Sequence, residues 1–284
     1  MKLQFRRVIY EFPARPLIMG IVNLSGDSFS GDGLADVDAA LIQARSLIND
    51  GADIIDVGAE SARTNRAPIS EQEEIDRFGS FVSRWDEVLD QRAPGTAYPA
   101  LSINTWRPAV VRAVLREGGD LLNDIGGLPT EENAQTCAET GAALLIMHTV
   151  GAPKIPHTHV GYDDVMQRLQ DFFAEKIALA ERAGLSRDAI VLDPGIDFAK
   201  QRDDNLRIYR DLAHLHRLGR PILLPVSRKT VIGDVLGLPA PERDAGTLAC
   251  LTAGQLRGAH IFRVHNVRAA AQAARMIEAI VGND

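Results

Sequence analysis

The sequence alternates between short apolar runs and longer stretches with helical spacing, and this alternation restricts the fold more than any other feature. The runs begin near Leu17, Asp53, Ala100, Asp120, Ala143, Ile190, Ile222 and Ile261. The stretches that follow them are 36–50, 70–89, 108–117, 131–140, 162–183, 203–215, 243–257 and 266–281. One run plus one stretch takes about 33 residues, the length of a βα repeat. The pattern therefore predicts parallel strands connected by helices.

Eight such units are the number that closes a parallel barrel, whereas an open doubly wound sheet usually stops at five or six strands. A length of 284 residues would also allow two domains. However, the one stretch rich in proline and glycine, residues 92–99, is too short to serve as a linker. We therefore predict a single α/β domain over residues 1–284, a (β/α)₈ TIM barrel preceded by a short β-hairpin in residues 1–12.

The charge and the cysteine content exclude several classes of protein. The net charge of −7 disfavours binding to nucleic acid or to an anionic membrane. No apolar run is long enough to span a bilayer, and the first residues lack the apolar core of a signal peptide. Cys137 and Cys250 are too few for a disulfide framework or a zinc cluster. We expect a cytoplasmic protein.

Polar side chains stand where each predicted strand ends, which is the end that carries the active site in parallel barrels. They are Asn23, Asp56 with Glu60, Asn104, Asn123 with Asp124, His148, Asp193, Ser227-Arg228-Lys229, and Arg263 with His265. Any one of them can simply mark the start of a loop. Together they are chemically mixed and converge on one end of the barrel, which predicts a ligand site.

Two kinds of ligand group are indicated. Amides, a carboxylate and an ammonium suit a neutral heterocycle that has both donors and acceptors; these groups belong to Asn104, Asn123, Asp193 and Lys229. Cations with an amide suit a phosphate or diphosphate, because arginine presents a planar fork to phosphate oxygens. These groups belong to Asn23, Arg63, Arg263 and His265.

Eight segments resemble those of dihydropteroate synthases and follow in the same order. They are 18–33 (IMGIVNLSGDSFSGDG), 51–63, 101–105, 121–128, 144–154, 190–206 (beginning IVLDPG), 222–233 (ILLPVSRKTVIG) and 243–267. The resemblance implies a transferase of folate biosynthesis. Such an enzyme condenses 6-hydroxymethyl-7,8-dihydropterin diphosphate with p-aminobenzoate, giving 7,8-dihydropteroate and diphosphate.

The resemblance also implies roles for individual residues. Pterin binding falls to Asn104, Asn123, Asp193 and Lys229, and diphosphate binding to Asn23, Arg63, Arg263 and His265. Phe29, Thr64 and Ser227 lie at the p-aminobenzoate pocket, Asn23 binds Mg²⁺, and Asp193, Lys229 and Arg63 are catalytic. The implied partners are the two small-molecule substrates and a second copy of the chain, packed through the last helices.

The sequence departs from the family pattern at several of these segments. Ser25-Gly26 replaces Thr-Pro, Ser61-Ala62-Arg63-Thr64 replaces Ser-Thr-Arg-Pro, Asn104 replaces an aspartate, and Asp197 and Ala199 replace glycines. Loss of the charge at Asn104 should weaken its hydrogen bonds by about 1 kcal/mol, so Asn104→Asp should raise pterin affinity. The altered loops predict weaker binding of sulfonamides, which mimic p-aminobenzoate.

Three alternatives compete with a synthase. The departures fit a pterin-binding paralogue without activity, although the retained cations and Asp193 favour catalysis. A pterin-dependent methyltransferase barrel would not need the anion-binding set. His157 and His159 suggest a metal hydrolase, but they follow the fifth strand in a loop rather than lying on the first strand.

Overall fold

The computed structural model describes residues 1–12, 15–24, 37–60, 67–91, 97–155 and 160–282. Its main strands are β3 (Leu17–Asn23), β4 (Ile54–Gly58), β5 (Ala100–Asn104), β6 (Leu121–Asp124), β7 (Ala143–Met147), β8 (Ile190–Asp193), β9 (Leu223–Pro225) and β10 (Ile261–Val264). They form one sheet in the order β8-β7-β6-β5-β4-β3-β10-β9, and all the pairings are parallel. A parallel bridge between Leu192 and Ile222 joins the two outer strands. The sheet therefore closes, and the predicted (β/α)₈ barrel is confirmed.

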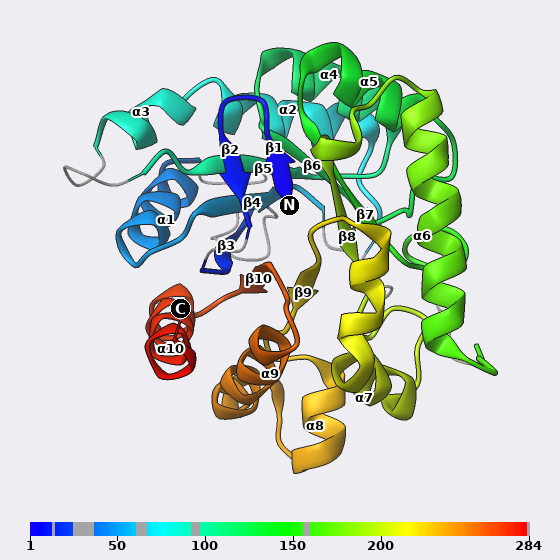
Figure 1. Cartoon of the computed structure of the whole chain (residues 1–284). Helices are drawn as coiled ribbons and strands as arrows, with labels where there is room; N and C mark the ends of the chain where they lie inside the picture. Colours follow the sequence, from blue (N-terminus) through cyan, green and yellow to red (C-terminus); the bar gives the residue numbers. More distant parts are fainter. Residues whose placement is uncertain (13–14, 25–36, 61–66, 92–96, 156–159, 283–284) are drawn as a thin grey trace.

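Helices surround the strands (Figure 1). The α-helices are α1 (Val37–Asn49), α2 (Glu71–Val82), α3 (Trp85–Asp90), α4 (Pro108–Glu117), α5 (Glu132–Thr140), α6 (Val165–Arg182), α7 (Arg202–Asp211), α8 (Thr230–Leu236), α9 (Asp244–Leu256) and α10 (Val267–Val281). Short 3₁₀ helices are η1 (Arg187–Ala189), η2 (Leu212–Leu218) and η3 (Ala240–Glu242). Among the described helices, none combines the length and apolar character needed to cross a membrane.

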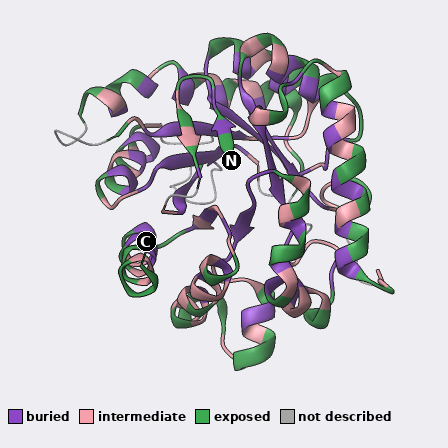
Figure 2. Cartoon of the chain, viewed as in Figure 1, coloured by how far each residue is buried: buried purple, intermediate pink, exposed green. Residues whose placement is uncertain are grey.

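Burial follows the layers of the barrel, with buried strands and helices that turn an exposed side outward (Figure 2). Met19, Met147, Phe172 and Phe173 belong to the hydrophobic core. Cys137 is buried and unpaired, and Cys250 is partly buried and unpaired. These side chains therefore serve packing, as their apolar surroundings in the sequence suggest.

The strand positions are predicted well by the sequence, but three helical regions differ from the prediction. The stretch 203–215 is divided between α7, which ends at Asp211, and the 3₁₀ helix η2. The stretch 70–89 is not one helix, because the chain leaves helical geometry at Arg84 (φ −109°, ψ 10°) and α3 then begins. The short helix α8, between β9 and α9, is not predicted at all. It has only seven residues and ends at Gly237, so it shows little helical periodicity.

The predicted hairpin, β1 (Lys2–Gln4) paired antiparallel with β2 (Ile9–Glu11), is confirmed. It lies across the barrel in Figure 1. Leu3 of β1 is fully buried, and Arg220 donates to the Lys2 carbonyl at 2.8 Å. Because β1 packs against η1, which directly precedes β8, the hairpin covers the amino-terminal end of the barrel.

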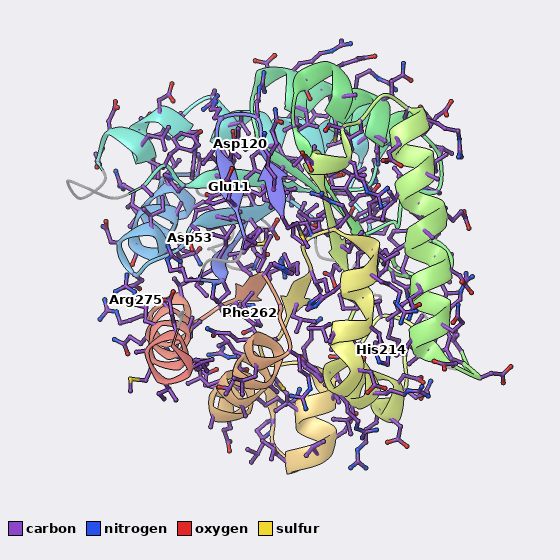
Figure 3. All side chains as sticks on the ribbon, in the orientation of Figure 1. Glu11, Asp53, Asp120, His214, Phe262 and Arg275 are labelled. Carbon is purple, nitrogen blue, oxygen red and sulfur yellow. The ribbon has the colours of Figure 1, made fainter. Side chains whose placement is uncertain are left out.

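Two buried carboxylates, Asp53 and Asp120, lie near this hairpin (Figure 3). Each accepts a bond from the backbone of a neighbouring strand: Asp53 Oδ2 from Ile18 N and Asp120 Oδ2 from Leu101 N, both at 2.9 Å. These acids connect strands at the amino-terminal end. The carboxyl-terminal end is the one where the predicted site residues lie.

Candidate active site

Side chains from β4, β5, β6 and β10 meet at one fully buried carboxylate, Asp56. Ser102 Oγ donates to Asp56 Oδ1 at 2.6 Å, and Asn104 Nδ2 donates to Oδ2 at 3.2 Å. Asn123 Nδ2 lies 3.2 Å from both oxygens, and Arg263 Nε donates to Oδ2 at 2.7 Å. Four strands therefore contribute polar groups to one cluster at the carboxyl-terminal end.

The strand register places these groups together. Asp56 pairs with Ser102 across β4 and β5, and Asn104 pairs with Asn123 across β5 and β6. Ser102 and Asn104 are two residues apart, so they point to the same face of their strand. The sequence places Asp56 among the polar residues at the strand ends but assigns it to neither ligand group; its bonds to four neighbouring side chains are found only in the structure.

Asn123 leaves a buried acceptor without a partner among the described residues. Its amide nitrogen is directed at Asp56, whereas its Oδ1 is buried and accepts no hydrogen bond from that part of the chain. An unpaired buried polar atom costs about 1–3 kcal/mol. A ligand with an N–H group at this position would remove that cost.

Asp193, at the end of β8, supplies a second carboxylate. Its Oδ1 accepts from the Gly195 N–H at 2.7 Å. Burial raises the pKa of Asp193 to about 6, although Lys229 and the other nearby cations oppose the shift. The carboxylate is therefore mostly ionised at neutral pH.

Lys229 stands at the N-cap of α8 with its ammonium turned back toward the residues after β8. Its Nζ donates to the Ile196 carbonyl at 2.8 Å and lies 5.1 Å from the centre of the Phe198 ring. Burial lowers the pKa of Lys229, and the charges of Asp197 and Asp193 act against that shift. An ammonium has three N–H groups, so donors remain for a ligand.

Ser227 and His265 form a pair beside Arg263. Ser227 Oγ accepts from the His265 backbone N–H at 3.2 Å and lies 2.8 Å from His265 Nδ1. In the tautomer with the ring proton on Nε2, the Ser227 hydroxyl donates to Nδ1. The protein packed around the ring and the nearby cations, first Arg263, lower the pKa of His265 to about 4. The ring is thus neutral near pH 7 and offers a neutral donor rather than a charge.

Asn23 ends β3 at the same rim and is exposed. A Cβ placed on the neighbouring Gly58 would lie 3.9 Å from Asn23 Oδ1 and 3.9 Å from Asn104 Cβ. The Asn23 amide and the Asn104 side chain thus flank the same glycine. No cluster of three or more metal-ligating acids, histidines or cysteines occurs among the described residues.

Three other strand-end candidates have partners inside the protein. Glu60 pairs with Arg107 and Lys154 at 2.7 and 2.6 Å. Asp124 accepts from Gly126 N and Asn133 Nδ2 at 2.8 and 2.9 Å. His148 Nδ1 lies 2.8 Å from Lys200 Nζ. These residues hold loops and helices around the site.

Several predicted site residues lie outside the described residues. They are Phe29, Arg63 and Thr64, together with the altered segments 25–26 and 61–64 and the pair His157 and His159. The two replaced glycines are described: Asp197 and Ala199 keep left-handed backbone, with φ of 68° and 50°. The chain has therefore retained the glycine-like path without the glycines.

The fold and the site are those of a (β/α)₈-barrel enzyme whose rim combines amides, carboxylates and cations. The family model described as pterin binding enzyme matches residues 19–265. The chain belongs to this family of pterin-binding enzymes.

Within the family, the similar proteins are dihydropteroate synthases. That of Escherichia coli (strain K12) is 37% identical over 268 residues, which cover 94% of this chain and 92% of the relative. The Xanthomonas albilineans enzyme, solved with 4-aminobenzoic acid, matches with a TM-score of 0.87 and 32% identity over 100% of this chain and 99% of that one. The Yersinia pestis enzyme, solved with a sulfonamide drug, matches with a TM-score of 0.87 and 33% identity over 99% of both chains.

Proposed function

We infer that this chain is a dihydropteroate synthase, which condenses 6-hydroxymethyl-7,8-dihydropterin diphosphate with p-aminobenzoate. The observation that carries the inference is the buried Asn123 Oδ1, which has no donor in the described part of this pterin-binding family member. A pterin ring offers N–H donors along one edge, and one of them would satisfy this atom.

Four side chains that differ in hydrogen-bonding character would bind the pterin ring. The ionised Asp193 accepts only, Lys229 donates only, and the amides of Asn104 and Asn123 do both. Asp56 orients both amides through their Nδ2 atoms, so their carbonyl oxygens turn away from it and toward the ligand.

The diphosphate would lie at the rim formed by Asn23, Arg63, Arg263 and His265. Arg263 Nε is bonded to Asp56, and among the described residues no acceptor is bonded to its two terminal nitrogens. Those nitrogens match the geometry of a phosphate group. His265 adds the Nε2–H donor that its bond with Ser227 leaves available.

Mg²⁺ fits this rim as an ion carried by the diphosphate. It keeps several waters and binds through few protein oxygens when substrate phosphates are present. Asn23 Oδ1 is such an oxygen, and a full protein cage is not needed. Bound in this way, Mg²⁺ would neutralise charge on the leaving diphosphate.

In the reaction, the bond between the pterin methylene carbon and the diphosphate oxygen breaks, and its electron pair leaves with the diphosphate. Asp193 stabilises the positive charge that develops on the pterin. The nitrogen of p-aminobenzoate forms the new C–N bond and loses one proton to water. Arg63 and Lys229 would complete the catalytic group, and Phe29, Thr64 and Ser227 would hold the p-aminobenzoate.

The altered loops carrying Phe29 and Thr64 would make sulfonamides weaker inhibitors of this chain than of the Yersinia pestis enzyme.

The same proposal includes one domain over residues 1–284, a cytoplasmic location and a homodimer. The two unpaired cysteines support a reducing compartment. The dimer is supported by large apolar side chains on α9 and α10 that are 58–72% exposed: Leu256, Met276, Ile280 and Val281. Light scattering tests the proposed dimer: the wild type should have the mass of a dimer, and Ile280→Lys should have the mass of a monomer.

The test of the proposed function is a coupled assay of diphosphate release with Mg²⁺ present. Release that requires both the dihydropterin diphosphate and p-aminobenzoate supports a synthase. Pterin binding without release would indicate a non-catalytic paralogue, the alternative that Asn104 favours because its amide has replaced a charged acceptor.

A further inference from the structure

Asp197 lies between β8 and α7, at a position where the family pattern has glycine. Its backbone is left-handed, with φ of 68°. This region is unfavourable for most side chains, although aspartate tolerates it better than others. A side chain kept in this conformation is a candidate for a specific role, and its contacts show what that role is.

The carboxylate of Asp197 caps the amino end of α8. Oδ2 accepts from the backbone N–H of Thr230 at 2.5 Å, and Oδ1 accepts from that of Val231 at 3.2 Å. The first N–H groups of a helix have no partner inside the helix, and the N-cap residue Lys229 provides none from its own side chain. Asp197 therefore provides the capping acceptors for a helix that begins 33 residues later in the chain.

Asp197 is itself held in place by α7. Its backbone N–H donates to Asn205 Oδ1 at 2.9 Å, and Asn205 Nδ2 returns a bond to Asp197 Oδ1 at 3.3 Å. Asn205 is buried, so this pair does not depend on an exposed contact. The helices α7 and α8 are neighbours in the fold (Figure 1), and Asp197 connects them.

The residues on both sides of Asp197 contact the Lys229 ammonium. Ile196 accepts its hydrogen bond through the backbone carbonyl, and the Phe198 ring lies beneath it. One short segment therefore holds Lys229 at two points: at the backbone that follows it, through the Asp197 carboxylate, and at its charged end.

We propose that Asp197 is a positioning residue that sets where Lys229 presents its ammonium, and that it thereby sets the affinity of the site for the pterin ring. The proposal rests on the proposed function, because it assigns Lys229 to the pterin. Without the Asp197 carboxylate, two N–H groups at the start of α8 lose their acceptor. The Lys229 backbone then keeps the bond from Arg243 to its carbonyl but loses the support on its N–H side.

Charge gives this role a signature that a purely structural cap would lack. Asp197 and Asp193 raise the pKa of Lys229, whereas burial and Arg263 lower it. Lys200 is a further cation that faces this group, and His265, which also faces it, is neutral over this pH range. Removing the Asp197 charge should therefore lower the pKa of Lys229, so that Lys229 loses its proton at a lower pH than in the wild type.

The experiment compares Asp197→Gly, Asp197→Asn and a matched control, Asp164→Asn. Asp164 caps α6 through bonds to Met166 N and Gln167 N, and it contacts no pterin residue in the described structure. The dissociation constant of a pterin without diphosphate is measured by calorimetry between about pH 6.5 and 9, and the unfolding free energy of each variant is measured in parallel. Comparison with the wild type at each pH cancels the titration of the pterin itself.

Asp197→Gly should bind the pterin about tenfold more weakly than the wild type. Asp197→Asn keeps one acceptor, so its pterin affinity should approach that of the wild type at low pH. As the pH rises, the affinity of this variant should decrease at a lower pH than the affinity of the wild type does. Asp164→Asn should lose stability without a change in pterin affinity. Wild-type affinity and an unchanged pH profile in both Asp197 variants would overturn the proposal, even if they are less stable. Absence of pterin binding by the wild type would instead contradict the proposed function.

Discussion

Arg263 Nε donates to Asp56 Oδ2 at 2.7 Å, so a carboxylate on β4 anchors the guanidinium that β10 brings to the rim. Asp56 is fully buried, whereas the Arg263 side chain is 24% exposed. The arginine therefore has one fixed nitrogen inside the barrel, and the rest of its guanidinium extends toward the predicted diphosphate position.

Replacing Asp56 by asparagine should loosen this anchor. The new amide nitrogen would face donors from Asn104, Asn123 and Arg263, and breaking a buried ion pair typically costs about 3 kcal/mol. We expect that loss in the unfolding free energy, measured with urea, and weaker binding of diphosphate. Ser102→Ala removes only one hydrogen bond to Asp56 and should cost about 1 kcal/mol. Equal diphosphate affinity in the wild type and Asp56→Asn would contradict the anchoring role.

Asn104→Asp should have opposite effects on the empty and on the occupied site. Asn104 Nδ2 now donates to Asp56 Oδ2 at 3.2 Å, and in the variant two carboxylates would face each other. Their repulsion should lower the unfolding free energy by about 1–2 kcal/mol at neutral pH. Protonation of the new carboxylate at position 104 relieves the repulsion, so the loss should shrink as the pH falls.

In the occupied site, the charged acceptor at position 104 should raise pterin affinity. Calorimetry on the wild type and on Asn104→Asp measures this directly. An affinity that stays the same or falls would show that Asn104 orients Asp56 and does not contact the pterin.

Binding of diphosphate should draw a proton onto His265. Burial and the neighbouring Arg263 lower the pKa of His265 to about 4, so the ring is neutral at pH 7, and nearby phosphate oxygens would raise that pKa again. Because the protonated ring binds the anion better, the affinity should rise as the pH falls toward the pKa of the complex. Titrations in two buffers of different ionisation enthalpy count the protons taken up. His265→Gln should take up fewer protons than the wild type, and an identical number would refute the mechanism.

Ala199→Gly should stabilise the protein. Ala199 has φ of 50°, a left-handed conformation that costs alanine about 1 kcal/mol and glycine almost nothing. The unfolding free energy should therefore rise by about that amount, less the greater entropy of glycine in the unfolded chain. A decrease would mean that the alanine methyl group packs usefully.

The barrel was predictable because each strand is a local pattern: an apolar run that ends in a polar residue and is followed by helical spacing. The site was predictable only in part. Asp193, Asn123 and Lys229 stand at strand ends, where position alone indicates function. Asp56 is also a strand-end candidate, but its partner Arg263 is 207 residues away, so its place at the centre of the cluster is visible only when the barrel is closed.

The helix α8 shows the same limit in its local structure. Its first N–H groups are bonded by Asp197, far earlier in the chain, and its N-cap residue, Lys229, makes no side-chain capping bond that would signal a start. A helix stabilised by a distant side chain leaves little trace in its own sequence. The break in the predicted helix 70–89 at Arg84 also leaves no sign in the local sequence, because no proline or glycine stands at that point.

The most direct test of the account is the formation of the new carbon–nitrogen bond. Purified wild-type protein is incubated with Mg²⁺, the dihydropterin diphosphate and isotopically labelled p-aminobenzoate, and the products are analysed by mass spectrometry. We predict labelled 7,8-dihydropteroate from the wild type and a loss of about a hundredfold or more in rate for Asp193→Asn, the loss typical of removing one charge-stabilising group. A wild-type protein that binds the pterin but forms no labelled product would contradict the account.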